Sequence, residues 1–368
     1  MIVADVTSFF AAQAGGIRSY YRAKARWMPA LGVECHFVVP GARRESEPFE
    51  RGWLHRVPGP GLGSGYRAFG DLAALRDVLA SIAPDVLEVG SHYVLPQLLA
   101  AVAPRRKPAR VGFYHADFPT TYVAPALARA PACVRALATR AAWSLVRGQH
   151  ARYDATLAGS HGIAASLIAR GVPRVRWVGL GVDPALADRA MRVETLGRLG
   201  YLGRLADDKE IGVVLAAAPL IARATGARIA IAGAGPRAAD VHAAAARGEV
   251  DAVGVVEDVA GFLDSVDALI VPGRYESFGL AAAEALAAGR PVIAADSGGA
   301  AELVTRSGGG LTFAAGSPRA LTDAVSALYR MSAPARAALG ERGRAHVLAT
   351  HAWPDVFARV HAIYRELV

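Results

Sequence analysis

The sequence predicts an α/β protein in which parallel sheets are covered by helices on both faces. Three observations lead to this prediction. Short apolar runs typical of buried strands alternate with longer segments of helical periodicity in the first half of the chain. A strand–helix–strand pattern appears again over residues 266–302. The chain has 368 residues, of which 53% are hydrophobic, and this size suits two ordinary globular domains.

The first half contains the clearest alternation of strands and helices. In chain order, we expect these elements at Ile2–Val6, Ile17–Met28, Cys35–Val39, Leu72–Ser81, Val86–Val89, Val111–Tyr114, Ala126–Val146, Ala155–Leu157 and Arg176–Val178. Residues 40–70 are rich in Gly, Pro and charged residues, so we expect a mobile loop region there. In parallel sheets of this kind, ligands bind outside the carboxyl ends of the strands.

Two such strand ends carry candidate ligand-binding residues. Gly15 and Gly16 follow the first strand and open a helix, where glycine allows a ligand to approach the backbone closely. They do not form a G-x-G-x-x-G motif, so we expect no nicotinamide or flavin cofactor at this site. His115 directly follows another strand, which favours a ligand contact, whereas an isolated histidine elsewhere is more often structural.

The segment 266–302 contains an isolated carboxylate. Its expected elements are a strand at Ala268–Val271, a helix at Gly279–Ala288 and a strand at Pro291–Ala295. Glu284 is the only ionisable residue between Glu276 and Arg290, and the helix around it is apolar on every side. A buried carboxylate without a partner is energetically costly, so Glu284 requires a partner that the adjacent sequence does not supply.

The geometry of this helix suggests a nucleotide diphosphate as that partner. The helix begins at Gly279 and Leu280, where free backbone N–H groups and the positive end of the helix dipole suit a phosphate. Glu284 lies five residues further, roughly 7–8 Å along the helix axis. This is about the distance from a diphosphate to the ribose of the same nucleotide. Glu276, in the preceding loop, would then lie beyond the phosphate, where a second sugar would be.

The run Glu276-Ser277-Phe278-Gly279-Leu280, followed by Glu284, resembles the E-x7-E signature of retaining glycosyltransferases of family 4. The resemblance spans nearly the whole chain. It implies the GT-B fold, with two Rossmann-like α/β/α domains facing across a cleft. The domains expected from it are an acceptor-binding domain at 1–180, a nucleotide-sugar-binding domain at 181–350, and a C-terminal helix at 351–368 that packs back on the first domain.

The same resemblance extends to two cations in the second half. Gly203-Arg204-Leu205, with Lys209 four residues later, resembles the family's G-R-L-x3-K-G segment, except that Glu210 replaces the last glycine. Cations at these positions would stabilise the negative charge that develops on a departing diphosphate. The alternative is that Arg204 and Lys209 merely pair with Asp207 or Asp208.

Together, the resemblance implies a site made of both halves. The residues expected to be catalytic are His115, Arg204, Lys209 and Glu276. Those expected to bind the nucleotide-sugar are Gly15, Gly16, Gly203, Ser277, Phe278, Gly279, Leu280 and Glu284. No Asp-x-Asp motif occurs in the sequence, so we expect neither a metal nor another cofactor.

Other interpretations remain open at this point. Residues 233–238 spell G-x-G-x-x-A after a strand, which favours a dehydrogenase, but Pro236 removes one N–H group that a pyrophosphate would use. A nucleotide-sugar epimerase, a phosphorylase or a non-catalytic nucleotide-sugar-binding module would fit the same fold.

The basic charge is concentrated in the first half of the chain. Residues 1–180 hold 22 Lys and Arg against 11 Asp and Glu, whereas the rest hold 19 against 21. Ordinary solvated surface explains this excess as well as an anionic partner does. The interpretation as an anionic partner predicts a glycan or lipid-linked acceptor and peripheral contact with an anionic membrane, but no nucleic acid. With no apparent signal peptide or spanning segment, we expect a cytoplasmic protein at the inner face of the membrane.

Overall fold

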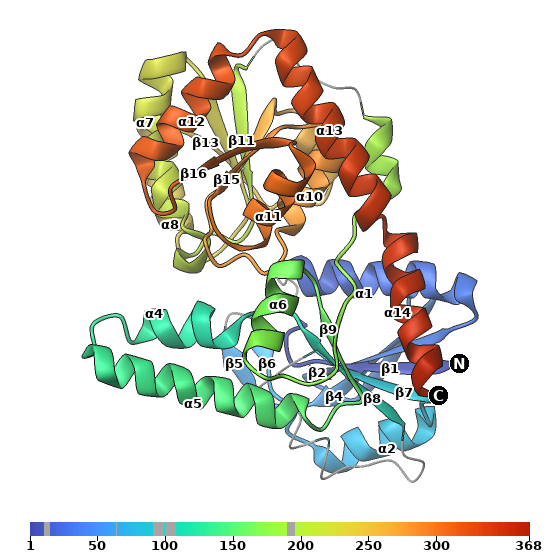
Figure 1. The fold of residues 1–368 in the computed structure, drawn as a ribbon. Helices are drawn as coiled ribbons and strands as arrows, with labels where there is room; N and C mark the ends of the chain where they lie inside the picture. Colours follow the sequence, from blue (N-terminus) through green and yellow to red (C-terminus); the bar gives the residue numbers. More distant parts are fainter. Residues whose placement is uncertain (11–14, 64, 91–98, 100–107, 190–195) are drawn as a thin grey trace. The chain divides into compact units, whose positions relative to one another are not determined.

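The computed structural model describes residues 1–10, 15–63, 65–90, 99, 108–189 and 196–368. The chain forms two compact units (Figure 1). Unit 1 comprises Met1–Gly179 together with Trp353–Val368, and unit 2 comprises Leu180–Ala352. The C-terminal helix therefore belongs to the same unit as the N-terminus.

Unit 1 is built on an eight-stranded sheet in the order β10-β9-β8-β7-β1-β2-β4-β3. All neighbours in it are parallel except β3 and β4, and β5 and β6 form a separate hairpin. The strands are β1 Ile2–Val6, β2 Glu34–Gly41, β3 Glu45–Phe49, β4 Gly52–Pro58, β5 Gly61–Gly63, β6 Tyr66–Arg67, β7 Val86–Val89, β8 Ala109–Tyr114, β9 Ala155–Ala158 and β10 Val175–Trp177.

The prediction of a loop region over residues 40–70 was wrong. Strands β3 and β4 lie there and pair in antiparallel fashion at the edge of the sheet. Their sequence resembles a loop because one face of this edge is solvated and carries charge, including the ion pair between Arg56 and Glu47. Leu54 and Val57 of β4 are buried and hold the hairpin on the core.

The helices of unit 1 lie on both faces of the sheet (Figure 1). They are α1 Gly15–Trp27, η1 Met28–Leu31, α2 Leu72–Ile82, η2 Pro119–Val123, α4 Ala124–Ala126, α5 Ala132–His150, α6 His161–Ala169 and α14 Trp353–Leu367. The helix expected from residue 126 begins only at Ala132, because Pro131 precedes it with extended backbone angles.

A buried network of charged and hydroxyl groups ties α1 and α14 to the sheet of unit 1. The ammonium of Lys24 on α1 lies 2.6 Å from a carboxylate oxygen of Asp5 and 3.3 Å from one of Glu88. It also donates to the hydroxyl of Tyr364 on α14, at 2.7 Å. Burial and the nearby Glu88 raise the pKa of Asp5, whereas Lys24 and hydrogen bonds lower the pKa of Glu88 despite its burial. The pKa values of the two carboxyl groups are thus shifted in opposite directions around one buried cation.

Unit 2 contains a six-stranded, fully parallel sheet in the order β13-β12-β11-β14-β15-β16. Its strands are β11 Arg198–Leu202, β12 Arg228–Ala232, β13 Asp251–Gly254, β14 Ala268–Val271, β15 Val292–Ala295 and β16 Gly310–Phe313. Its helices are η3 Pro184–Asp188, η4 Asp207–Lys209, α7 Ile211–Thr225, α8 Ala238–Ala246, α9 Val259–Asp264, α10 Leu280–Ala287, α11 Gly298–Ser307, α12 Pro318–Arg330 and α13 Ala333–His351.

Alternate residues of each strand in unit 2 serve two separate cores. Ile229 and Ile231 of β12 pack with α7, α8 and α12 on one face of the sheet. Ala230 and Ala232 pack with α9, α10 and α11 on the other face. The strands are apolar on both faces because helices cover both, as expected for a parallel sheet. The result is a three-layer α/β/α unit.

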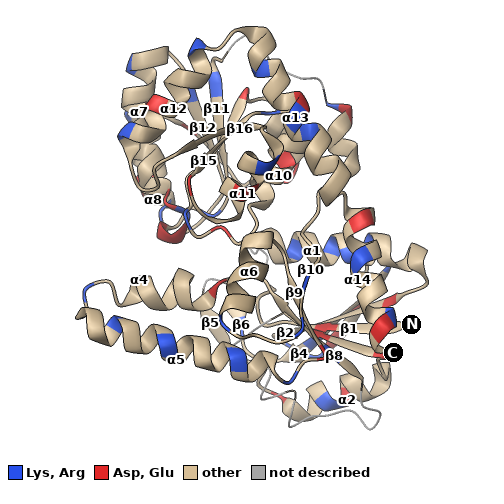
Figure 2. Cartoon of the chain, viewed as in Figure 1, with Lys and Arg blue, Asp and Glu red and all other residues tan. Residues whose placement is uncertain are grey.

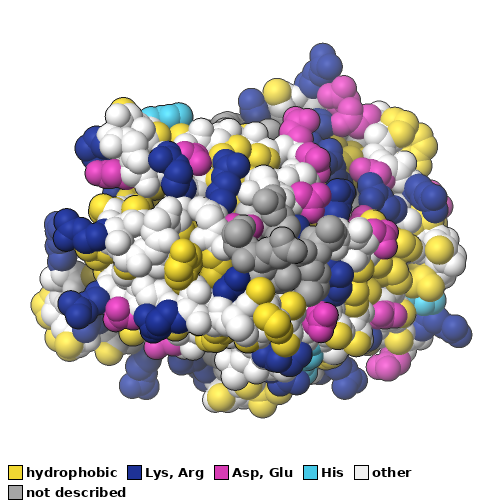
Figure 3. Space-filling model, turned by 90° about the horizontal axis from the view of Figure 1, so that it is seen from above, with side chains coloured by type: hydrophobic (Ala, Val, Ile, Leu, Met, Phe, Trp, Pro, Cys, Tyr) yellow, Lys and Arg dark blue, Asp and Glu magenta, His cyan; other side chains and the backbone are white. Residues whose placement is uncertain are grey.

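The surface carries mixed charge. On the face seen in Figure 3, basic and acidic side chains are interspersed among apolar ones. Among the described residues, no helix has both the length and the apolar character needed to cross a bilayer.

Candidate active site

The N-terminus of α10 is an open, uncapped helix end in unit 2. Gly279 precedes the helix with φ 88°, a left-handed conformation that glycine adopts without strain. No side chain caps this end, so the first backbone N–H groups, including that of Leu280, remain available to a ligand. A phosphate is the ligand that such an end suits best.

Glycines allow the loop before α10 to lie directly against the start of α11. A Cβ atom on Gly299 would lie 2.4 Å from the backbone of Phe278, and one on Gly279 would lie 2.9 Å from Ala300. The backbone N–H of Gly299 donates to the carbonyl oxygen of Glu276 at 2.6 Å. This contact fixes the loop that carries Glu276 and the neighbouring, partly buried Ser277.

Lys209 and Glu276 meet although they are far apart in the sequence. The Lys209 ammonium lies 2.7 Å from Oε1 of Glu276. Lys209 ends the short helix η4, and Glu210 then turns the chain into α7 with a left-handed φ of 51°. Both side chains of the pair are only partly buried, so a ligand has access to them.

Arg204 is held by Asp208 rather than by Asp207. One guanidinium nitrogen of Arg204 lies 2.6 and 2.7 Å from the two carboxylate oxygens of Asp208. Arg204 thus forms a local ion pair, whereas Lys209 pairs with Glu276. The role of each cation towards a diphosphate stays a prediction. Gly203 lies beside this pair, and its carbonyl oxygen would be 1.8 Å from a Cβ atom on Gly233.

That close approach gives a structural reason for the G-x-G-x-x-A pattern. A Cβ atom on Gly235 would likewise lie 2.3 Å from the carbonyl oxygen of Leu205. The two glycines of the pattern thus allow the loop after β12 to pack against the loop after β11. Packing between loops accounts for them without a dinucleotide.

Glu284 has no partner in the described part of the chain. Its carboxylate makes no hydrogen bond or ion pair with any described residue, and the residue is partly buried at the middle of α10. Burial raises the pKa of Glu284 to about 7. The carboxyl group is thus poised to ionise when a hydrogen-bond donor reaches it.

The sequence did not reveal a second ion pair beside this site. Nε of Arg274 lies 2.7 Å from Oε1 of Glu210, and Arg274 also approaches the backbone at Gly316. The pair connects the loop before α10 to the start of α7. Arg274 and Glu210 are 64 positions apart, so the sequence does not relate them. The only signal was that Glu210 replaces the family's glycine.

The candidate residues of unit 1 directly follow strand β8 or begin helix α1. Gly15 and Gly16 begin α1, with open space where their Cβ atoms would be. The ring of His115 stacks on Phe113, with 4.1 Å between ring centres. Its Nε2 is buried and has no hydrogen-bond partner among the described residues. Burial lowers the pKa of His115 to about 4, so the ring is neutral near pH 7.

Among the described residues, no group of three or more His, Cys, Asp or Glu side chains is arranged to hold a metal ion. The cations of the candidate site in unit 2 are Lys209 and Arg204, each paired with a carboxylate, and the N-terminus of α10 adds a partial positive charge.

Comparison with known proteins gives the family. The family model described as Glycosyltransferase Family 4 matches residues 14–186, and the one described as Glycosyl transferases group 1 matches residues 197–331. A "GDP-mannose-dependent alpha-mannosyltransferase" of Mycobacterium tuberculosis is 30% identical over 89% of this chain and 87% of its own length. A "GDP-mannose-dependent alpha-(1-6)-phosphatidylinositol dimannoside mannosyltransferase" of the same species is 31% identical over 88% and 87%.

Solved structures match the fold over the full length. A sucrose-phosphate synthase from Thermosynechococcus elongatus aligns with a TM-score of 0.80 and 18% identity, covering 100% of this chain and 98% of that one. Anabaena HepE in complex with UDP-glucose aligns with a TM-score of 0.76 and 14% identity, covering both chains completely. The fold is GT-B, and the chain belongs to the family 4, group 1 glycosyltransferases.

Proposed function

We propose that this glycosyltransferase moves mannose from GDP-mannose to a hydroxyl group of a lipid-linked or glycan acceptor. The reaction would retain the anomeric configuration and use neither a metal nor another cofactor. The names of the two mycobacterial relatives support this donor, and one of them names a phosphatidylinositol mannoside. The observation that carries the proposal is the grouping of the Lys209–Glu276 pair, the open end of α10 and Glu284, which has no partner in the described ranges.

In this proposal the donor binds along α10. Its diphosphate accepts from the backbone N–H groups at Leu280 and from Lys209 and Arg204. Its ribose hydroxyls donate to Glu284 and supply the partner that this carboxylate does not find among the described residues. Gly203, Ser277 and Phe278 complete the walls around the diphosphate.

Binding of the donor would redistribute the Lys209–Glu276 ion pair. Lys209 would turn to a diphosphate oxygen, and Glu276 would accept from hydroxyls of the mannose. By the resemblance to the family, neutral His115 of unit 1, with Nε2 unpartnered among the described residues, stays a predicted contact of a donor sugar. Gly15 and Gly16 leave open space for a diphosphate at the start of α1.

The transfer step needs no nucleophile from the protein. The anomeric C–O bond of the donor breaks, its electron pair goes to the diphosphate, and the sugar passes through an oxocarbenium-like state. The acceptor oxygen forms the new bond on the same face, and its proton goes to the departing diphosphate. The cations and the helix end stabilise the charge on that diphosphate, which is the role a metal ion has in other enzymes.

The names of the relatives also support the proposal of retention. The sugar of GDP-mannose is α-linked, and both relatives are named for alpha products. We place the reaction in the cytoplasm at the inner face of the membrane, where a lipid-linked acceptor and a soluble sugar nucleotide meet. A UDP-hexose is the second candidate donor, since UDP-glucose is bound in the similar HepE structure.

The test is product analysis with GDP-mannose and with UDP-glucose, each with and without a lipid-linked acceptor and a chelator. We expect GDP and an α-mannosylated acceptor from GDP-mannose, at the same rate with the chelator. A β-linked product or loss of the reaction in chelator would overturn retention or metal independence. An isomerised donor without transfer would indicate an epimerase, and binding without any product would indicate a non-catalytic module.

A further inference from the structure

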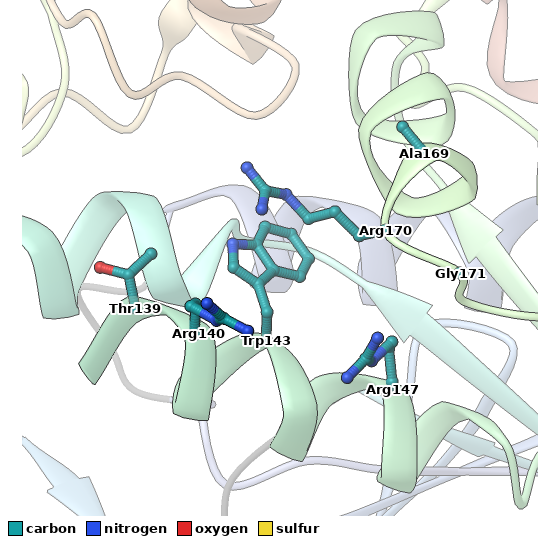
Figure 4. A pocket seen from close by; sticks show the side chains of 7 residues that line it. All are labelled: Thr139, Arg140, Trp143, Arg147, Ala169, Arg170 and Gly171. Atoms are coloured by element: carbon teal, nitrogen blue, oxygen red, sulfur yellow. The ribbon is translucent and has the colours of Figure 1, made fainter. Parts of the chain in front are cut away.

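A cavity lined by arginines lies between α5 and α6 in unit 1, apart from every residue assigned to sugar transfer. Its volume is about 510 Å³. It is lined by Thr139, Arg140, Trp143, Arg147, Ala169, Arg170 and Gly171. Residues 140, 143 and 147 lie on one face of α5 because they are spaced at three and seven residues. Figure 4 shows Arg140 and Arg147 rising from α5 on either side of Trp143, and Arg170 reaching over from the end of α6.

The three guanidinium groups of this cavity have no acidic partner in the part of the chain that the structure describes. Among the described residues, neither Arg140, Arg147 nor Arg170 lies within 4.0 Å of a carboxylate or makes a side-chain hydrogen bond. The charge of Arg170 acts weakly on Asp117, whose carboxylate is already hydrogen-bonded to Tyr114 and Thr120. Arg204, in contrast, forms an ion pair with Asp208.

Trp143 holds one of these cations in place. Its indole is 5% exposed, and the guanidinium carbon of Arg170 lies 4.2 Å from the ring centre. The indole Nε1 is buried and has no acceptor among the described residues. A buried donor without an acceptor costs about 1–3 kcal/mol, so an anion that brings an oxygen to this cavity would relieve that cost. The cation–π contact fixes Arg170 before any ligand arrives.

The surroundings of the cavity are strongly basic. From Ala124 to Trp177 the chain has eight arginines and a single acidic residue, Asp154. Figure 2 shows basic residues recurring along α5 with no acidic residue between them. An ordinary solvated helix face mixes both signs of charge, as the face in Figure 3 does. This stretch accounts for most of the basic excess of the first half of the chain.

Apolar side chains are exposed on the same two helices. Leu137 is 70% exposed one turn before Arg140, and Ile168 is 61% exposed two residues before Arg170. Val134 and Leu145 of α5 are also exposed. Cations next to exposed aliphatic side chains are the combination by which a protein surface binds an anionic bilayer.

We propose that Arg140, Arg147 and Arg170 bind the headgroup phosphate of an anionic membrane lipid, with the exposed aliphatic side chains of α5 and α6 entering the acyl region. Guanidinium groups suit this ligand because each presents two parallel N–H donors to two phosphate oxygens. This site does not depend on the proposed donor or on the transfer reaction. It anchors the protein whichever acceptor it uses.

The experiment compares vesicle binding of the natural protein with that of two double variants. Arg140→Gln/Arg147→Gln removes two charges from the cavity. Arg44→Gln/Arg51→Gln removes two charges from exposed arginines of the same unit, neither of which pairs with a described residue. Sedimentation with phosphatidylglycerol–phosphatidylcholine vesicles gives the partition coefficient of each protein. Thermal unfolding and GDP-mannose binding confirm that each variant is folded and has an intact donor site.

We expect the cavity variant to lose about tenfold or more of its partition coefficient and the matched variant to lose only a small part of that. Equal losses would overturn the proposal, because they would show general charge attraction instead of a phosphate site. The second arm titrates glycerol 3-phosphate in solution. If glycerol 3-phosphate displaces the natural protein from vesicles but does not displace the cavity variant, this result supports the phosphate site. Tight binding of glycerol 3-phosphate without any vesicle binding would exclude the lipid as its source.

Discussion

At the scale of single residues, the free protein already contains the parts that the proposed reaction needs. Lys209 and Glu276 neutralise each other at 2.7 Å, so neither charge is left unpaired before a donor binds. Glu284 is different, since no described residue satisfies it. The sequence showed that Glu284 is isolated among apolar neighbours, but the pairing of Lys209 with Glu276 required the fold, because 67 residues separate them.

Lys209→Met is expected to lower kcat/KM for transfer by about 10²–10³, because an oriented cation at a departing phosphate contributes on that order. Lys209→Arg should retain part of the activity. Steady-state kinetics with the donor varied measures both effects. Arg223→Met, an exposed cation on α7, is the matched control. Activity of Lys209→Met within a factor of about three of the natural enzyme would remove Lys209 from the mechanism.

Glu284 should make the free protein less stable as the pH rises. Its pKa of about 7 in the folded protein lies above the ordinary value of 4.5. Its stabilising contribution is therefore fully present below pH 4.5 and is lost as the pH rises through about 7. Glu284→Gln should remove this dependence and raise the free energy of unfolding at pH 8 by at most about 3 kcal/mol. Urea unfolding of both proteins from pH 5 to pH 8 measures the difference, and parallel curves would contradict the account.

At the scale of elements, the site depends on how closely two helix ends approach. The strand Ala268–Val271 and the helix after it were predicted almost to the residue, because a short apolar run and a glycine mark their ends. Strands β3 and β4 were missed because an exposed edge lacks that apolar signal. The contact of the Phe278 backbone with Gly299 was also not predictable, since nothing in the sequence relates the two positions in space.

Gly299→Ala should displace the loop that carries Glu276. A Cβ atom there would lie 2.4 Å from the backbone of Phe278, and overpacking of this kind costs about 1–3 kcal/mol. We expect weaker donor binding and a lower unfolding temperature. Gly212→Ala on α7 is the control, since its Cβ atom meets nothing within 4 Å and alanine favours the helix. Unchanged donor affinity in Gly299→Ala would show that α10 and α11 do not shape the site.

At the scale of the whole molecule, two separate α/β units with their own cores account for nearly every described residue. The alternation of apolar runs with helical segments predicted this architecture from the sequence. It did not predict that Lys24 and Tyr364, 340 residues apart, would join in the core of unit 1. A buried polar network is specified by tertiary contacts and has no local signal.

Lys24→Met should destabilise unit 1 by about 3–5 kcal/mol, because Glu88 would remain buried without its cation. Tyr364→Phe should cost less, about 1–3 kcal/mol. Arg22→Met, an exposed position of α1 near Glu50, is expected to change stability by about 1 kcal/mol or less. Denaturation followed by hydrogen exchange in α1 and α14 distinguishes loss of this network from unfolding of unit 2. Equal losses of stability in Lys24→Met and Arg22→Met would contradict the stabilising role of this network.

The most direct test of the account is proton release on donor binding at the Glu284 carboxyl. Calorimetric titration of GDP-mannose near pH 7, in buffers of different ionisation enthalpy, measures the number of protons released. Because the carboxyl titrates at about 7 in the free protein, hydrogen bonds from the ribose should ionise it and release part of a proton. Glu284→Gln should release none and bind the donor at least about tenfold more weakly. If Glu284→Gln bound GDP-mannose as tightly as the natural protein does and released as many protons, this result would contradict the proposed site.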